Sequence, residues 1–94
     1  MRRAARVDAN QADIVRDLRR LGYSVKVTST LKGFCDIVVG TDKKNFFFEI
    51  KDPAQPPSGR VLTPDEQSFH SSWRGQIDVI LTTEDALEIM SDPT

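Results

Sequence analysis

The amino-acid sequence predicts a single α/β domain in which a mixed sheet is flanked by helices. Apolar residues recur at helical spacing near the N-terminus, three β-rich runs follow, and a second helical segment precedes a fourth β-rich run. A chain of 94 residues with 38% hydrophobic content can build one compact core but not two. The expected order over residues 1–94 is therefore helix, strand, strand, strand, helix, strand, helix.

The first helix is expected over residues 8–21, with Gly22 placed to end it. Its apolar positions repeat every three or four residues: Ile14, Val15, Leu18 and Leu21. Residues 23–28 alternate between β-forming and polar side chains, which is typical of a strand.

Two apolar runs, residues 35–39 and 46–51, are separated by turn-forming residues and predict a β-hairpin. If the loop is residues 41–44, Val39 pairs with Phe46 and Asp36 stands opposite Glu49. A slip of one residue would move the apolar side chains to the wrong face, so the hydrophobic pattern supports this register.

A second helix is expected to begin after Thr63. Thr63 can cap the helix, Pro64 suits its first position, and Glu66 can complete a capping box. The helix should continue to about Trp73, with Phe69 and Trp73 on its buried side.

The remaining segments complete the predicted domain. Residues 52–59 contain three prolines and should form a loop, with Arg60 at its tip and placed to meet a ligand. Residues 76–81 predict a strand that the crossover through the second helix can lay parallel to a neighbour. Residues 84–90 predict a short closing helix.

Asp36, Glu49 and Lys51 form the candidate catalytic centre. Residues two apart in a strand share a face, so Glu49 and Lys51 should point the same way, toward the side on which the register places Asp36. Facing carboxylates on neighbouring strands repel unless a cation lies between them, and oxygen ligands favour Mg²⁺ or Mn²⁺. A Glu-x-Lys pair alone is more often a surface ion pair, but Asp36 at the facing position favours a metal site.

The pattern of Asp36 followed, after a hairpin, by Glu49-Ile50-Lys51 resembles the PD-(D/E)xK nuclease superfamily, and in particular its small virus-type replication-repair nuclease (VRR-NUC) branch, common in phages. The resemblance covers nearly the whole chain, through residues 9–11, 33–36, 48–51, 62–67 and 73–75. It implies a restriction-endonuclease-like core and a Mg²⁺- or Mn²⁺-dependent deoxyribonuclease that hydrolyses phosphodiester bonds.

The resemblance also implies roles for individual residues. Asp36 and Glu49 would bind the metal ion, together with the backbone carbonyl of Ile50. Lys51 would orient or deprotonate the attacking water. These roles agree with the chemistry of a divalent ion and an ammonium group beside a phosphodiester.

Four further residues bear on the site. Gln67 resembles a glutamine that relatives aim at the centre from the second helix, although a surface glutamine is an equal alternative. Gln11 stands where many relatives have a glutamate; its amide is expected to hold a metal-bound water at the site, but as a neutral ligand it makes a second metal ion less favourable. Cys35 replaces the usual proline before the aspartate and should face the core. His70 is expected to be a surface or interface residue rather than a general base.

Charge is unevenly distributed although the formal net charge is −1. Bases outnumber acids through Gly33, and only acids follow Gln76. This asymmetry predicts a basic face that docks on phosphates, while an ordinary solvated helix surface is the alternative. The candidate phosphate contacts are Arg2, Arg3, Arg6, Lys32 and Arg60.

The leading functional hypothesis is a structure-selective DNA endonuclease for branched DNA such as Holliday junctions or flaps, acting as a homodimer and without a nucleotide cofactor. A non-catalytic DNA-binding or assembly module on the same fold and a nuclease for linear DNA are the alternatives.

The sequence also predicts a cytoplasmic protein, as for a phage-encoded enzyme in a bacterial host. It has one cysteine, no signal-like apolar segment and no membrane-spanning run.

Overall fold

The computed structural model describes residues 8–92 and has the predicted order of helices and strands. The elements are α1 (Gln11–Arg20), β1 (Ser24–Val27), β2 (Ile37–Gly40), β3 (Asn45–Ile50), the 3₁₀ helix η1 (Pro57–Arg60), α2 (Pro64–Ser72), β4 (Asp78–Ile80) and α3 (Thr83–Met90). Only η1 is additional, and it lies in the proline-rich segment that was expected to be a loop. The α/β fold class is confirmed.

The four strands form one mixed sheet in the order β1-β2-β3-β4. β1, β2 and β3 are antiparallel neighbours, whereas β4 pairs with β3 in parallel after the crossover through α2. Val39 is paired with Phe46, and Gly40 with Asn45. The hairpin register predicted from the hydrophobic pattern is therefore confirmed.

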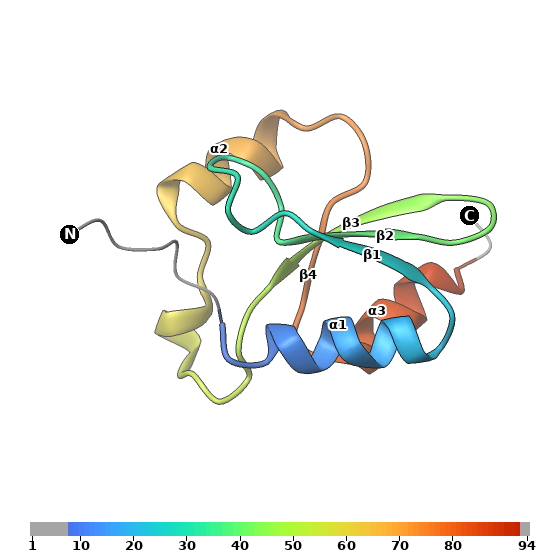
Figure 1. Ribbon diagram of the computed structural model, residues 1–94. Helices are drawn as coiled ribbons and strands as arrows, with labels where there is room; N and C mark the ends of the chain where they lie inside the picture. The colour runs from blue at the N-terminus through green and yellow to red at the C-terminus, as the bar shows by residue number, and fades with distance from the viewer. Residues whose placement is uncertain (1–7, 93–94) are drawn as a thin grey trace.

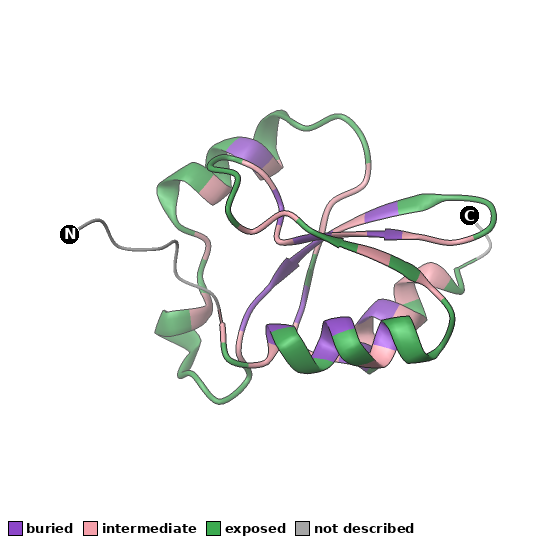
Figure 2. Ribbon diagram, in the orientation of Figure 1, coloured by how far each residue is buried: buried purple, intermediate pink, exposed green. Residues whose placement is uncertain are grey.

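Helices cover both faces of the sheet (Figure 1). α1 and α3 lie side by side against one face, and α2 lies over the other. The main core is between the sheet and the pair α1 and α3, where Figure 2 shows buried positions on facing surfaces. Its central side chains are apolar residues of β2, β3, β4 and α1: Ile37, Val39, Phe48, Ile50, Ile80 and Leu18. Alternate residues of β3 thus enter this core and leave the intervening ones on the α2 side.

A smaller aromatic cluster packs between α2 and the opposite face of the sheet. The Trp73 ring stacks on Phe47, with 5.2 Å between centroids, and lies 5.3 Å from Phe69. α2 ends at Ser72, and Trp73 adopts an extended conformation with 41% of its surface exposed. The predicted end of the helix at about Trp73 is confirmed, but the prediction of a core-buried Trp73 is wrong, because the indole covers the rim of this second cluster.

The termini of the elements depend on contacts that are distant in sequence. Asn10 does not cap α1 with its side chain but donates from Nδ2 to the carbonyls of Lys51 and Leu81, at 3.0 and 2.8 Å. This contact ties the start of α1 to the ends of β3 and β4.

Among residues 8–92, no helix has the length and apolar character needed to cross a membrane.

Candidate active site

Glu49 and Lys51 are buried on the α2 side of β3. Their exposed fractions are 1% and 7%, and the intervening Ile50 enters the main core. The two side chains do not pair with each other, since Lys51 contacts Glu66 and Glu49 contacts His70. The interpretation of Glu49 and Lys51 as an ordinary surface ion pair is therefore wrong.

Asp36 lies directly before β2, and its backbone is still hydrogen-bonded to the chain on both sides. Its N–H donates to the Phe48 carbonyl, and its carbonyl accepts from Thr28 N–H. Its side chain turns toward the end of β3, where Oδ2 accepts a hydrogen bond of 2.7 Å from the Ile50 N–H. Asp36 thus stands on the same side of the sheet as Glu49, close enough to affect its ionisation.

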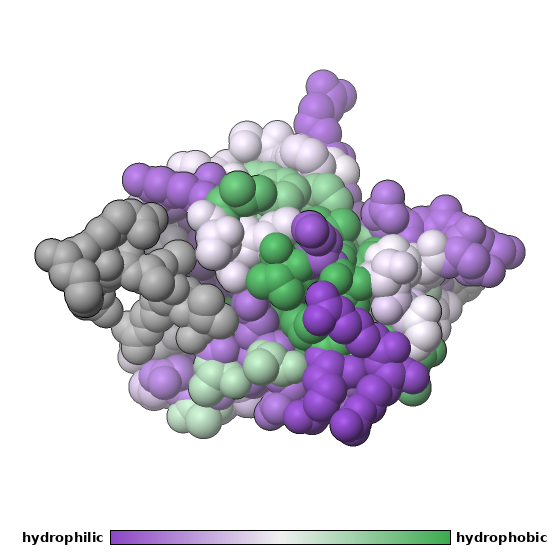
Figure 3. Space-filling view, viewed as in Figure 1, coloured by the Kyte–Doolittle hydropathy of each residue, from purple (hydrophilic) through white to green (hydrophobic). Residues whose placement is uncertain are grey.

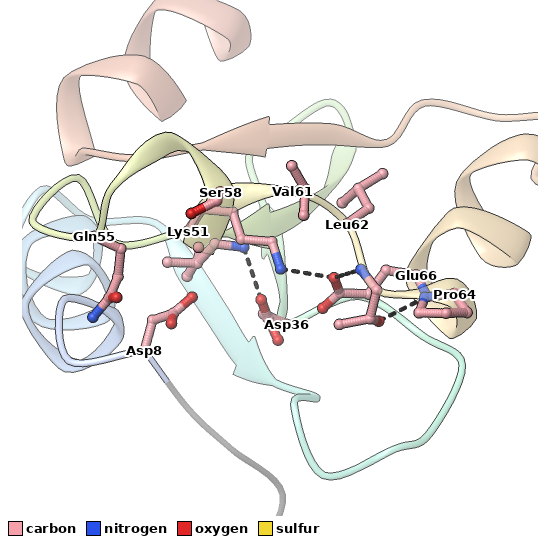
Figure 4. A pocket seen from close by; sticks show the side chains of 12 residues that line it. Asp8, Asp36, Lys51, Gln55, Ser58, Val61, Leu62, Pro64 and Glu66 are labelled. Atoms are coloured by element: carbon pink, nitrogen blue, oxygen red, sulfur yellow. Dashed lines mark hydrogen bonds and ion pairs between the residues drawn. The ribbon is translucent and has the colours of Figure 1, made fainter.

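A cavity of about 500 Å³ opens beside this cluster. Its charged lining is provided by Asp8, Asp36, Lys51 and Glu66, which face the same space in Figure 4. Residues of the segment between β3 and α2, together with the first turn of α2, form much of the remaining wall. Asp8 enters from the turn before α1, and burial is the main cause of its raised pKa. The cavity therefore collects acidic groups around one lysine.

Glu49 is the most strongly perturbed carboxyl group of the site. Burial, followed by the hydrogen bond and charge of Asp36 and the charge of Glu66, raises the pKa of Glu49 to about 9. His70 Nε2 lies 3.3 Å from Glu49 Oε1, and burial lowers the pKa of His70. At neutral pH these shifts favour a hydrogen bond between two neutral groups rather than an ion pair.

Lys51 is held by a glutamate of α2. Its Nζ donates to Glu66 Oε1 at 2.7 Å, with side-chain exposures of 9% and 22%. Burial acts to raise the pKa of Glu66, but the hydrogen bonds from Lys51 and the Thr63 N–H outweigh it, so that this pKa is lowered. Glu66 thus remains ionised opposite the lysine.

The donor set agrees with a hard divalent cation that uses few protein side chains. Asp36 and Glu49 bring carboxylate oxygens together, and Ile50 lines the cavity beside Asp36. Within residues 8–92, no three His, Cys, Asp or Glu side chains are grouped as a metal site. An ion would need main-chain or solvent oxygens in addition. A divalent cation between Asp36 and Glu49 would offset the repulsion by Asp36, which after burial is the main cause of the raised pKa of Glu49.

Neither glutamine predicted at the site reaches the cavity lining. Gln67 is exposed, and its Nε2 donates to the Leu62 carbonyl at 3.0 Å. Gln11 is buried in the first turn of α1, and its Nε2 donates to Ser29 Oγ at 3.2 Å. α2 buries Phe69 against the sheet, and this rotation of the helix leaves Gln67 on the solvent side.

Three site residues were missed by sequence reasoning. Glu66 was assigned only to the capping box, which is present, and His70 to the surface or an interface, whereas its side chain is 13% exposed and contacts Glu49. The usable signal was that Glu66 and His70 are four residues apart and share a helix face. Asp8 was placed in the first helix but lies before α1.

The predicted phosphate contacts are dispersed. Arg2, Arg3 and Arg6 lie outside the described residues. Lys32 is exposed, with its Nζ 3.8 Å from Asp65 Oδ2. Arg60, at the end of η1, does not line the main cavity but lines a second pocket together with Lys51, Val79 and Leu81. Of the two predicted contacts that the structure describes, neither Lys32 nor Arg60 lines the cavity beside Asp36.

The surface formed by α1 and β1 combines apolar and basic residues. Figure 3 shows a hydrophobic patch on this side with hydrophilic side chains around it, and a shallow pocket here is lined by Val15 and Val27 together with arginines of α1. Arg16 pairs with Asp13 and Asp17, at 2.9 and 3.0 Å. Part of the predicted basic face is thus neutralised within the helix.

Fold and site together define a small α/β domain with an acidic, lysine-containing cavity at the end of its central hairpin. No family model, curated protein or solved structure matches the chain.

Proposed function

We propose that the chain is a Mg²⁺- or Mn²⁺-dependent deoxyribonuclease that hydrolyses phosphodiester bonds. The observation that supports this most is the convergence of Asp36, Glu49 and Lys51 on one side of the sheet, at the end of β3. Burying the Glu49 carboxyl group and the Lys51 ammonium group beside the half-buried Asp36 is costly for stability alone. The resemblance of these residues to the PD-(D/E)xK motif supplies the class of reaction.

In this proposal Asp36 and Glu49 hold the ion, with the Ile50 carbonyl as a further ligand. A bound divalent ion lowers the pKa of water and offsets negative charge on the phosphate. Lys51, held 2.7 Å from Glu66, adds a second positive charge beside the reacting phosphate. Glu49 must lose its proton to act as a ligand, so we expect metal binding to release protons.

Within this function, we propose that the substrate is branched DNA, such as a Holliday junction or a flap, and that two copies of the chain act together. Each copy would contribute one centre of Asp36, Glu49 and Lys51, and cutting two strands of a junction requires two such centres. A domain of 94 residues buries a limited part of its surface, which favours self-association. No nucleotide cofactor enters this reaction.

A DNA-binding or assembly module without catalytic activity is the second candidate. The observation that favours it is the absence of a group of three metal-ligating side chains among residues 8–92. Gln11 also faces Ser29 rather than the cavity, so it cannot compensate for the glutamate found in many proteins with this motif. This candidate predicts salt-dependent DNA binding without cleavage.

The decisive experiment is a cleavage assay on labelled four-way junction, flap and linear duplex, with Mg²⁺, with Mn²⁺ or with EDTA. Glu49→Ala and Lys51→Ala should abolish metal-dependent cleavage, whereas Glu84→Gln in the first turn of α3 serves as the acidic control. Cleavage of linear duplex at the rate of the branched substrates would reject structure selectivity. Equal activity of both alanine variants and the parent protein would reject the nuclease.

A further inference from the structure

Two residues of α2 that are four apart contact two residues that are two apart at the end of β3. Glu66 contacts Lys51, and His70 contacts Glu49. Residues four apart in a helix are separated by about 6 Å along its axis, and residues two apart in a strand by about 6.6 Å. One face of α2 can therefore contact Glu49, near the end of β3, and Lys51, directly after it, at the same time.

Glu66 connects the start of α2 directly to the site. Its Oε1 accepts from the Thr63 N–H at 2.8 Å and from Lys51 Nζ at 2.7 Å. The Glu66 N–H donates in return to Thr63 Oγ1 at 3.3 Å. The oxygen that closes the capping box is therefore the same one that holds the ammonium group, so the position of Lys51 is tied to the first turn of the helix.

The capping box by itself does not require a charge at this position. A glutamine can accept the same hydrogen bond from Thr63 N–H, and the two residue types are interchangeable in this motif. Lysine, in contrast, has a flexible four-carbon stem and a compact charge that keeps one orientation only when a partner holds it. We therefore expect that a carboxylate at position 66, and not an amide, is needed to hold the Lys51 ammonium in one orientation.

We propose that Glu66 is a positioning residue that holds the Lys51 ammonium at the cavity. This inference rests on the proposed nuclease function for its catalytic consequence, but the contact itself can be tested without metal or DNA. Glu66 also lines the cavity, but in this proposal its carboxylate acts on the Lys51 ammonium and not on the substrate.

The test compares Glu66→Gln with Asp65→Asn, which removes the same charge from the adjacent, exposed position on α2. The first readout is the proton–nitrogen correlation signal of the Lys51 ammonium in isotope-labelled protein, because a held ammonium exchanges its protons slowly enough to be seen. We expect this signal in the parent and in Asp65→Asn, and its loss in Glu66→Gln with an unchanged Tm. In the cleavage assay, kcat should fall by about 10- to 100-fold in Glu66→Gln with little change in KM.

Each outcome decides the proposal. Persistence of the Lys51 signal in Glu66→Gln, or a kcat equal to that of Asp65→Asn, would overturn it. If the parent cleaves no DNA, the nuclease and the catalytic role of Glu66 both fail, while the spectra still decide whether Glu66 holds Lys51. If Glu66→Gln does not fold, Thr63→Ala replaces it. This variant loses the Thr63 hydroxyl that caps α2 but keeps the Glu66 carboxylate, so the Lys51 signal must be retained. Loss of the signal in Thr63→Ala would overturn the proposal.

Discussion

Replacing Glu49 by glutamine should change how the stability of the metal-free protein depends on pH. The pKa of Glu49 is raised from its ordinary value of 4.5 to about 9 by burial and by Asp36. Between these two values the folded state binds one proton that the unfolded state has lost, so stability is fully present below about pH 4.5 and falls as pH rises toward about 9. Glu49→Gln keeps the shape of the side chain and removes this titration.

The size of the effect follows from the same shift. One proton contributes about 1.4 kcal/mol per pH unit, so the parent should lose up to about 4 kcal/mol between about pH 5 and pH 8 through this group. Glu49→Gln should lack that loss and be the more stable protein at the higher pH. Because whole domains are stable by only about 5–15 kcal/mol, the difference is readily measured.

Urea unfolding in EDTA at several pH values, followed by the fluorescence of Trp73, measures this difference. Trp73 is the single tryptophan and is stacked on Phe47, so its emission reports packing of the α2 face. Mg²⁺ or Mn²⁺ should stabilise the parent at high pH more than Glu49→Gln, since an ion replaces the proton. Parallel pH profiles for the two proteins would refute the assigned protonation of Glu49.

Three further outcomes test the packing around the site. Cys35 is buried with a thiol pKa raised to about 11, so thiol reagents near neutral pH should modify it only after unfolding, and rapid labelling of the native protein would contradict its burial. Asn10→Ala removes the donor to the Lys51 and Leu81 carbonyls and should cost about 1–3 kcal/mol in chemical denaturation, against no more than about 0.5 kcal/mol for the exposed Glu88→Gln. Phe48→Ala, at the centre of the main core, should cost about 3–5 kcal/mol with an unchanged m-value, and a smaller loss would show that the core collapses into the cavity created.

Local patterns in the sequence determined the elements and the pairing of the hairpin. Alternation of apolar residues and a four-residue loop allow only one register with a buried face, so the sequence alone places Asp36 opposite Glu49. The capping box at Thr63 was equally local, because it joins residues three apart in the chain. These features depend on short-range geometry that repeats along a helix or strand.

Only the tertiary structure decided which side chains of the helices reach the site. Successive residues of a helix point in directions about 100° apart, so the rotation of α2 on the sheet selects Glu66 and His70 and leaves Gln67 in solvent. That rotation is set by the packing of Phe69 and the neighbouring aromatic rings, which sequence periodicity over one short helix does not define. The position of Asp8 has the same kind of cause, because Asn10 anchors the entry to α1 on the ends of two strands far away in the chain.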